Sequence, residues 1–228
     1  MRGKLYGVGI GPGDPELLTL KALRVIRESR IVALPGKDPR ETVAYKIVQG
    51  AYPEIAEKEL LAVDMPMTKD AEKLAASHDA GAEAIIKYLD QGMDVAFPTL
   101  GDPTVYSTYL YVHKRVAAAG YDTEIVSGIT SFCAVAARLN MGLVEKAEPL
   151  HVIPASYQIE EALGLPGTKV LMKAGKQMAE VKKTLLEQNL PASMIENCGM
   201  ESERIYRSAG EIPDDAGYYS LIIVKEKP

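Results

Sequence analysis

The stretch from residue 95 to 108, Val-Ala-Phe-Pro-Thr-Leu-Gly-Asp-Pro-Thr-Val-Tyr-Ser-Thr, constrains the fold more than any other part of the chain. Its apolar run, residues 95–97, follows Gly92 and is typical of a buried strand. Asp102-Pro103 predicts a helix start, with an N-cap aspartate before proline at the first helical position. Such a corner of an open α/β sheet often binds a ligand, because the strand end and the helix N–H groups face one crevice. A plain connection without a ligand fits the spacing equally well.

A second corner of this kind lies near the N-terminus. A strand over residues 5–10 leads into Gly11-Pro-Gly-Asp-Pro15, which predicts another helix start. The alternating glycines look like a dinucleotide fingerprint, but Pro12 or Asp14 falls where its third glycine is needed. Pro12 lacks an N–H and Asp14 is negatively charged, so this turn does not suit a phosphate. It remains a tight turn in which glycine lets the backbone approach a ligand closely.

The order of the other elements predicts an α/β fold of two domains. Strands and helices alternate through residues 1–118, which is typical of a parallel sheet covered by helices. Residues 119–228 carry several short strands and few helices, which indicates an α+β half with a partly antiparallel sheet. A chain of 228 residues is long enough to give both domains a core.

Composition excludes several classes of protein. Hydrophobic residues make up 47% and charged residues 25%, as in ordinary globular proteins, and the net charge of −5 argues against a nucleic-acid partner. No apolar run approaches the roughly 20 residues of a membrane span, and no signal-peptide core is present, so we expect a cytoplasmic protein without a membrane partner. The two cysteines and three histidines lack the spacing of a zinc site, so we expect no protein-bound metal.

Three motifs, in this order, resemble those of the tetrapyrrole (corrin/porphyrin) methylase family. They are Val8-Gly-Ile-Gly-Pro-Gly-Asp-Pro15, Leu100-Gly-Asp-Pro103 and Ser127-Gly-Ile-Thr-Ser131, and the similarity extends through essentially the whole chain. The resemblance implies two α/β domains of the tetrapyrrole methylase fold, with the active-site cleft between them. It also implies S-adenosylmethionine as the methyl donor, a tetrapyrrole as the substrate and a homodimer as the assembly.

Two longer stretches narrow the choice within the family. Residues 101–109 and 128–140 are similar to the enzymes that methylate C20, the meso carbon, of cobalt-factor II or precorrin-2 in cobalamin (vitamin B12) biosynthesis. The products would be cobalt-factor III or precorrin-3A, and overall similarity favours the cobalt form. The uroporphyrinogen C-methylases carry an aspartate after the second strand, where this chain has Pro35. The acid/base pair proposed for those enzymes is therefore not implied here.

The motif positions imply a set of S-adenosylmethionine contacts, of which Asp102 and Ser131 match best. The complete set is Pro12, Leu100, Gly101, Asp102, Val105, Thr130 and Ser131, followed in the second half by Met172, Lys173, Cys198, Gly199, Ser220 and Leu221. The resemblance names no proton acceptor. If one is needed, Tyr106 or Tyr109 is a candidate, although an aromatic residue at a helix start more often packs.

A methyl sulfonium is already an activated electrophile, so the protein's task is to orient the reactants and exclude water. The substrate's peripheral carboxylates need basic partners. Lys37, Arg40 and Lys46 follow the second strand and could supply charge-assisted contacts, although a charge-rich loop is more often a solvated connection.

Three other functions stay open. The chain could be another tetrapyrrole C-methylase of the corrin pathway, or a diphthine-synthase-like enzyme that shares the fold and cofactor but methylates a protein. It could also be a sensor that binds S-adenosylmethionine or a tetrapyrrole without methyl transfer. A nucleotide-binding oxidoreductase is the poorest fit, because Pro12 and Asp14 interrupt its fingerprint.

Overall fold

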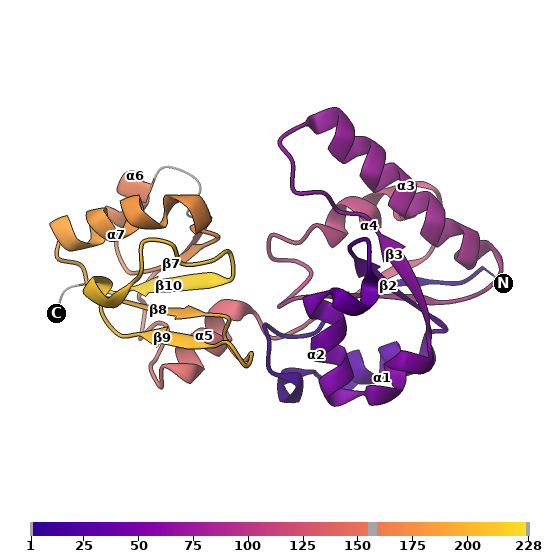
Figure 1. Cartoon of the computed structure of the whole chain (residues 1–228), viewed down its shortest axis with the longest axis horizontal. Helices are drawn as coiled ribbons and strands as arrows, with labels where there is room; N and C mark the ends of the chain where they lie inside the picture. Colours follow the sequence, from indigo (N-terminus) through magenta and orange to yellow (C-terminus); the bar gives the residue numbers. More distant parts are fainter. Residues whose placement is uncertain (1, 155–158, 227–228) are drawn as a thin grey trace. The chain divides into compact units, whose positions relative to one another are not determined.

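A computed structural model of the chain describes residues 2–154 and 159–226 (Figure 1). It divides into two compact units, Met1–Thr130 (unit 1) and Ser131–Pro228 (unit 2). The boundary expected after residue 118 lies before strand β5 (Thr123–Val126), whereas the structure places β5 in unit 1. The reason is that β5 pairs with β1 (Leu5–Gly9) and so completes the first sheet.

Unit 1 is built on a five-stranded sheet in the order β3-β2-β4-β1-β5. Its other strands are β2 (Ile31–Pro35), β3 (Glu59–Val63) and β4 (Val95–Thr99). Every neighbouring pair is parallel, as the alternating pattern predicted. The carboxyl ends of all five strands therefore lie along one edge, which we call the carboxyl edge.

Four helices cover the two faces of this sheet (Figure 1). Helices α1 (Leu20–Glu28) and α2 (Val43–Ala51) pack on one face through a core that includes Val25, Ile26, Ile47 and Val48. Helices α3 (Ala71–Asp90) and α4 (Tyr109–Ala118) pack on the other through a core that includes Ile85, Leu89, Val112 and Val116. Short 3-10 turns, η1 (Pro15–Leu17), η2 (Pro39–Glu41) and η3 (Pro53–Glu57), lie in the connections.

The predicted helix start at Asp102-Pro103 is wrong, because α4 begins at Tyr109. Residues 102–105 instead form a turn, in which the N–H of Val105 donates to the carbonyl of Asp102 at 3.1 Å. Tyr106 then adopts a left-handed φ of 49°, which interrupts any helix at that point. The predicted start at Asp14-Pro15 is also displaced, because Asp14 caps only η1 and α1 begins at Leu20.

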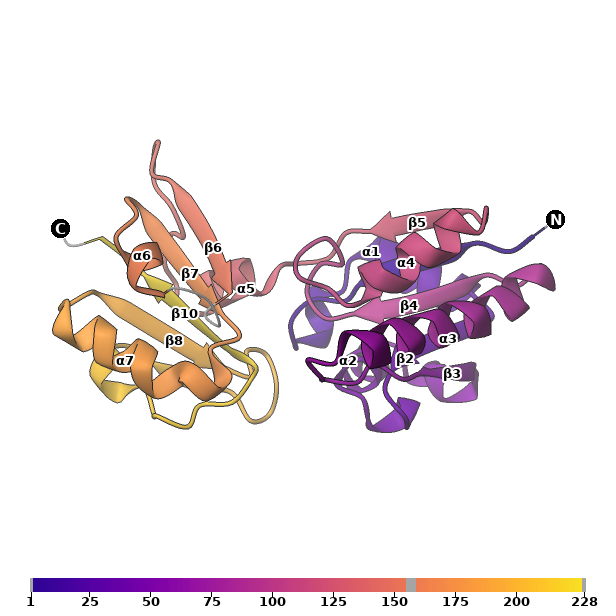
Figure 2. The ribbon, with the colours of Figure 1, turned by 90° about the horizontal axis from the view of Figure 1, so that it is seen from above.

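Unit 2 holds a second five-stranded sheet in the order β6-β7-β10-β8-β9. Figure 2 shows β6, β7, β10 and β8 side by side in this order, and Figure 1 shows β9 next to β8. Only β6 and β7 are parallel, which confirms the predicted partly antiparallel α+β half. The strands are β6 (Leu150–Pro154), β7 (Thr168–Met172), β8 (Ala192–Glu196), β9 (Arg204–Tyr206) and β10 (Ser220–Val224). The helices are α5 (Ser131–Arg138), α6 (Ile159–Leu163) and α7 (Met178–Glu187), with 3-10 turns η4 (Gly175–Gln177) and η5 (Ala209–Glu211).

The core of unit 2 forms around the fully buried Leu171, Met178, Met194 and Ile222. Each unit therefore encloses apolar clusters of its own. None of the helices in the described part of the chain is both long and apolar enough to cross a bilayer.

Candidate functional site

The two predicted corners are neighbours in unit 1. Strands β1 and β4 lie side by side, but the chain leaves β1 for α1 on one face and β4 for α4 on the opposite face. Connections that diverge from adjacent parallel strands open a crevice at the carboxyl edge, and ligands of open α/β sheets bind there. We call the loops that follow β1, β4 and β5 at this point the glycine corner.

Backbone contacts between glycines hold the first two loops together. The N–H of Gly101 donates to the carbonyl of Gly11 at 2.8 Å, and the N–H of Gly11 donates back to the carbonyl of Gly101 at 3.3 Å. Gly11 has a φ of 75° and Gly101 a φ of 68°, a region that glycine enters without steric cost. The loops that carry the two Gly-Asp-Pro motifs are therefore joined by a pair of backbone hydrogen bonds.

The loop after β5 packs directly on the other two. A Cβ built on Gly128 would lie 2.3 Å from the carbonyl oxygen of Gly101 and 2.7 Å from the carbonyl carbon of Gly9. A Cβ on Gly9 would lie 2.5 Å from the N atom of Gly128. Only glycine fits at either position, so the backbones of the three loops are in van der Waals contact.

Asp102 ties these loops together through both oxygens of its carboxylate. Its Oδ1 accepts from the N–H of Thr104 at 2.8 Å and from the hydroxyl of Thr104 at 2.6 Å. Its Oδ2 accepts from the hydroxyl of Ser127 and from the N–H of Gly128, the latter at 3.0 Å. Burial raises the pKa of Asp102, but these hydrogen bonds outweigh burial and leave the pKa below its ordinary value. Asp102 is therefore a buried anion that holds the glycine corner in shape.

This arrangement changes the interpretation of one expected contact. The carboxylate of Asp102 already accepts hydrogen bonds from Ser127, Gly128 and Thr104. A ligand would therefore meet the backbone of this loop, with the neighbouring Gly101 and Val105, and not this side chain. The sequence motifs did not predict the roles of Ser127, Gly128 and Thr104. The third motif contains Ser127 and Gly128, but only the strand order brings them to Asp102.

A further residue missed from the sequence is Thr99, the last residue of β4. Its Oγ1 is buried, and it is the one such side-chain oxygen or nitrogen without a hydrogen-bond partner among the side chains that the structure describes. Buried polar groups nearly always have a partner, so an unpartnered hydroxyl beside a crevice suits a contact with a ligand or water. Thr99 lies directly before Leu100 and Gly101, two of the expected cofactor contacts.

The two tyrosines considered as proton acceptors lie in different environments. Tyr109 is fully buried, and a Cβ on Gly7 would lie 2.0 Å from its ring, so the ring packs against the backbone of β1. Burial raises the pKa of Tyr109, and its hydroxyl lies 3.0 Å from Nδ1 of His113. This environment suits packing. Tyr106 is 45% exposed on the turn after Asp102 and remains the candidate of the two.

The expected contacts in unit 2 gather at one end of its sheet, although they are far apart in sequence. Met172 ends β7, Ser220 and Leu221 begin β10, and the antiparallel register places Leu221 beside Met172. Strand β8 also ends here, at Glu196, two residues before Cys198. The N–H of the intervening Asn197 donates to the carbonyl of Tyr219 at 3.0 Å. Lys173 and Gly199 have left-handed φ angles of 60° and 78°, which turn the chain sharply there.

Thr130 and Ser131, the other two expected contacts, lie at the boundary in the chain between unit 1 and unit 2.

The chemistry of the glycine corner indicates which ligands it suits. Residues 10–14, 100–108 and 127–130 contain no lysine, arginine or histidine, whereas Asp14 and the buried Asp102 carry negative charge. Such a corner lacks the cationic groups that phosphates usually need, and it favours a cationic ligand that backbone groups can contact. Within the described residues, no three His, Cys, Asp or Glu side chains are placed to hold a metal ion.

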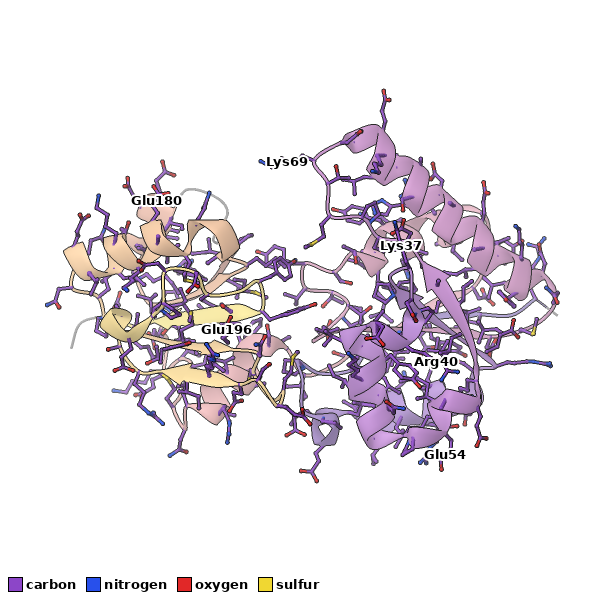
Figure 3. All side chains as sticks on the ribbon, viewed as in Figure 1. Lys37, Arg40, Glu54, Lys69, Glu180 and Glu196 are labelled. Carbon is purple, nitrogen blue, oxygen red and sulfur yellow. The ribbon has the colours of Figure 1, made fainter. Side chains whose placement is uncertain are left out.

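Of the three basic residues expected at the substrate rim, two have partners within the chain. Arg40 donates to the carbonyl of Ala56 in η3 at 3.2 Å, and Lys46 lies 3.4 Å from the carboxylate of Glu41. Lys37 is exposed two residues after the end of β2, at the carboxyl edge, and forms no ion pair within the described part of the chain (Figure 3). Figure 3 shows Arg40 on the side of the unit where Glu54 of η3 lies.

Comparisons with known proteins agree with this geometry. The family model described as Tetrapyrrole (Corrin/Porphyrin) Methylases matches residues 4–213. The chain is 34% identical over 226 residues to the "Probable cobalt-precorrin-2 C(20)-methyltransferase" of Methanocaldococcus jannaschii, a match that covers 97% of this chain and 96% of that protein. It is 32% identical over 235 residues to the cobalt-precorrin-2 C(20)-methyltransferase of Salmonella typhimurium, covering 100% of this chain and 98% of that protein.

A solved structure shows the same fold. The crystal structure of uroporphyrin-III C-methyl transferase from Thermus thermophilus, complexed with S-adenosylhomocysteine, superposes with a TM-score of 0.71 at 22% identity. The match covers 98% of both chains, so the likeness includes both units.

Proposed function

The chain belongs to the tetrapyrrole (corrin/porphyrin) methylase family, and we propose that it transfers a methyl group from S-adenosylmethionine to C20 of cobalt-factor II, or of precorrin-2. The product is then cobalt-factor III or precorrin-3A, on the route to cobalamin. The observation that carries the proposal is the end-to-end similarity, at 34% and 32% identity, to two relatives named for C20 methylation of cobalt-precorrin-2.

The residues of the glycine corner fit S-adenosylmethionine. The bound cofactor supplies an activated methyl group on a positively charged sulfur. The corner offers closely packed backbone at Gly11 and Gly101 and, among the described residues, an unpartnered hydroxyl at Thr99. Its own loops, residues 10–14, 100–108 and 127–130, contain no cationic side chain. The chain's own contribution is to orient the methyl group toward the substrate and to exclude water. Because the sulfur loses its charge during transfer, weakly polar surroundings suit the reaction.

The cofactor positions of this proposal come from both units. In unit 1 they are Pro12, Leu100, Gly101, Asp102, Val105 and Thr130, and in unit 2 they are Ser131, Met172, Lys173, Cys198, Gly199, Ser220 and Leu221. The proposal gives Asp102 the task of holding the loops, because its carboxylate already has four hydrogen bonds.

The substrate's carboxylates are proposed to meet the basic residues that follow β2. Lys37 forms no ion pair with any described residue and can contact a carboxylate without losing one, whereas Arg40 and Lys46 would have to exchange the partners they have. Replacing Lys37 and Arg40 by alanine should therefore weaken tetrapyrrole binding and leave S-adenosylhomocysteine binding near normal. Equal loss of both would refute this placement.

One experiment tests the proposed reaction. The purified protein is incubated anaerobically with S-adenosylmethionine and either cobalt-factor II or precorrin-2, and the tetrapyrrole is followed by mass spectrometry. A mass gain of one methyl group, located at C20 by NMR, is the expected result. Methylation at another carbon would indicate a different corrin C-methylase. Methylation of a translation factor in place of the tetrapyrrole would indicate a diphthine-synthase-like enzyme, and binding of both ligands without transfer would indicate a sensor.

The proposal also includes a homodimer that acts in the cytoplasm, as the family resemblance implies. Sedimentation equilibrium should then give twice the mass of the 24.7 kDa chain. A monomer at micromolar concentration would contradict it.

A further inference from the structure

The loop between β3 and α3, residues 64–70, lies at the same carboxyl edge as the glycine corner, but at the far side of the sheet. Passing along this edge from β1, one meets the loop after β4, then Lys37 after β2, and finally this loop after β3. Neighbouring strands are about 4.8 Å apart, so the edge from β1 to β3 spans about 14 Å. A flat macrocycle with its peripheral side chains could extend over such a distance.

The loop contains two methionines that lie in opposite surroundings. Met65 is partly buried and packs against the core beneath α3 and α4. Met67, on the other side of Pro66, is 86% exposed, the second most exposed of the large apolar side chains in the described residues. A methionine side chain is flexible and polarisable, and it is a common choice where a surface must fit an apolar partner.

The exposure of Met67 is not the result of an untethered loop. The N–H of Gly36 donates to the carbonyl of Val63 at 2.8 Å, which joins the ends of β2 and β3. The hydroxyl of Ser77 donates to the carbonyl of Asp64 at 2.6 Å, and Asp70 caps α3 through the N–H groups of residues 72 and 73. Both ends of the loop are therefore fixed, and its backbone holds Met67 outward.

Two exposed lysines accompany this methionine. Lys69 lies on the same loop, and Figure 3 shows its side chain extending away from the ribbon into open space, while Lys37 lies at the end of the neighbouring strand β2. The carboxylate of Asp70, beside Lys69, is already used by the helix cap. An exposed methionine with a lysine on its own loop and another at the end of the neighbouring strand matches a ligand with an apolar face and anionic groups around its rim.

We propose that residues 64–70 form a substrate-recognition loop, in which Met67 packs against the face of the tetrapyrrole macrocycle and Lys69, together with Lys37, contacts its peripheral carboxylates. This inference rests on the proposed function, because it takes a tetrapyrrole as the substrate. It adds a specificity element that neither the glycine corner nor the predicted basic rim contains.

The test uses the full-length protein and two pairs of variants. Met67→Ser removes the apolar surface and Met67→Leu keeps it, while Lys69→Glu reverses the charge on the loop. Lys87→Glu makes the same charge change at an exposed position in the last turn of α3, at the opposite end of the helix. Binding of cobalt-factor II is followed by absorbance titration, and binding of S-adenosylhomocysteine by calorimetry.

Met67→Ser and Lys69→Glu are each expected to weaken cobalt-factor II binding about tenfold, because the first removes an apolar contact of about that value and the second replaces an attraction by a repulsion. Met67→Leu and Lys87→Glu should bind it as the wild type does. Binding of S-adenosylhomocysteine should be unchanged in all four. Weakening by Lys69→Glu should also diminish as salt is added.

Two failures can be told apart. If the wild type binds and methylates cobalt-factor II but Met67→Ser and Lys69→Glu behave as Lys87→Glu does, the recognition loop is refuted and the proposed function stands. If the wild type does not bind a tetrapyrrole, the proposed function fails and this inference fails with it.

Discussion

At the scale of single residues, Asp102 is the group on which the site depends. It is 5% exposed, and all its recorded hydrogen bonds are to residues of the two loops that follow β4 and β5. A buried carboxylate is tolerated only when hydrogen bonds replace the water it has lost. The Asp-Pro sequence predicted that Asp102 caps a helix, but the structure contains no helix start at this position.

Replacing Asp102 by asparagine should destabilise the protein. The amide can accept at one atom only, so donors from Ser127 and Gly128 or from Thr104 lose their partner, at a cost of about 1–3 kcal/mol in the free energy of unfolding. Urea denaturation measures this cost, and calorimetry should show weaker S-adenosylhomocysteine binding because the loops are released. Asp79→Asn, at a carboxylate that is 59% exposed, is the control and should change either quantity little. A variant at Asp102 as stable and as tight-binding as the wild type would contradict the role assigned to it.

The stability that Asp102 provides should also depend on pH. Its pKa in the folded protein lies below the ordinary value of 3.8, so its contribution is complete above that value and is lost as the pH falls through the folded pKa. The difference in free energy of unfolding between the wild type and Asp102→Asn should therefore be constant from pH 7 to pH 5 and shrink below about pH 4. The difference for Asp79→Asn serves as the reference. A gap that widened toward low pH would mean that the pKa is raised.

Thr99 allows a contact with a ligand to be separated from a role in folding. Its Oγ1 has no partner among the described residues, so Thr99→Val removes a polar group that the fold does not use. Stability should stay the same or rise slightly, whereas S-adenosylhomocysteine binding should weaken about fivefold if the hydroxyl meets the ligand, the value of one hydrogen bond. Thermal denaturation and calorimetry give the two quantities. A loss of stability with unchanged binding would contradict this assignment.

At the scale of elements, the glycine corner depends on three loops whose backbones touch. The sequence predicted both Gly-Asp-Pro loops at strand ends, and β1 and β4 are where it placed them. It misplaced the helix starts, because Asp-Pro is as compatible with an isolated turn as with a helix cap. The left-handed φ of Tyr106 makes Asp102-Pro103 an isolated turn and not a helix start, and no local sequence pattern predicted this φ.

Gly128→Ala should disrupt the glycine corner. The added Cβ would lie 2.3 Å from the carbonyl oxygen of Gly101, where backbone and not a flexible side chain must move. We expect loss of S-adenosylhomocysteine binding and a fall of about 2 kcal/mol or more in the free energy of unfolding. The matched control is Gly120→Ala, which has nothing within 4 Å of the new Cβ and a φ of 81°. It should cost only about 1 kcal/mol of backbone strain and bind normally. Similar effects from both variants would show that the close contact is unimportant.

At the scale of the whole molecule, each unit has its own sheet and its own apolar core. The chain passes from one to the other between Thr130 and Ser131, inside the third sequence motif. The change in the order of elements suggested an earlier boundary, but β5 pairs with β1 and the loop after it packs on the loops of unit 1. Strand pairing, and not the order of elements along the chain, therefore sets the limit of the first unit.

Separate cores predict separate responses to a core mutation. Leu171 is fully buried in unit 2, and Leu171→Ala should cost about 2–5 kcal/mol there. Hydrogen exchange should then accelerate in β7, β8 and β10 and stay unchanged in β1 and β4. Phe97→Ala, in the core of unit 1, is the reciprocal variant and should show the opposite pattern. Equal acceleration in both sheets would show that the units unfold as one.

The sequence by itself determined the strands, most helices, the class of each half and the family, because periodicity and turn chemistry are local properties and the motifs are contiguous. The tertiary structure decided which distant groups meet. It joined Gly11 to Gly101, gave Asp102 its partners at Ser127 and Gly128, and gathered the second-half positions at one end of a sheet. These contacts depend on the strand order β3-β2-β4-β1-β5 and on the register of β7, β10 and β8, which are fixed by packing of the whole unit and are written in no single stretch of chain.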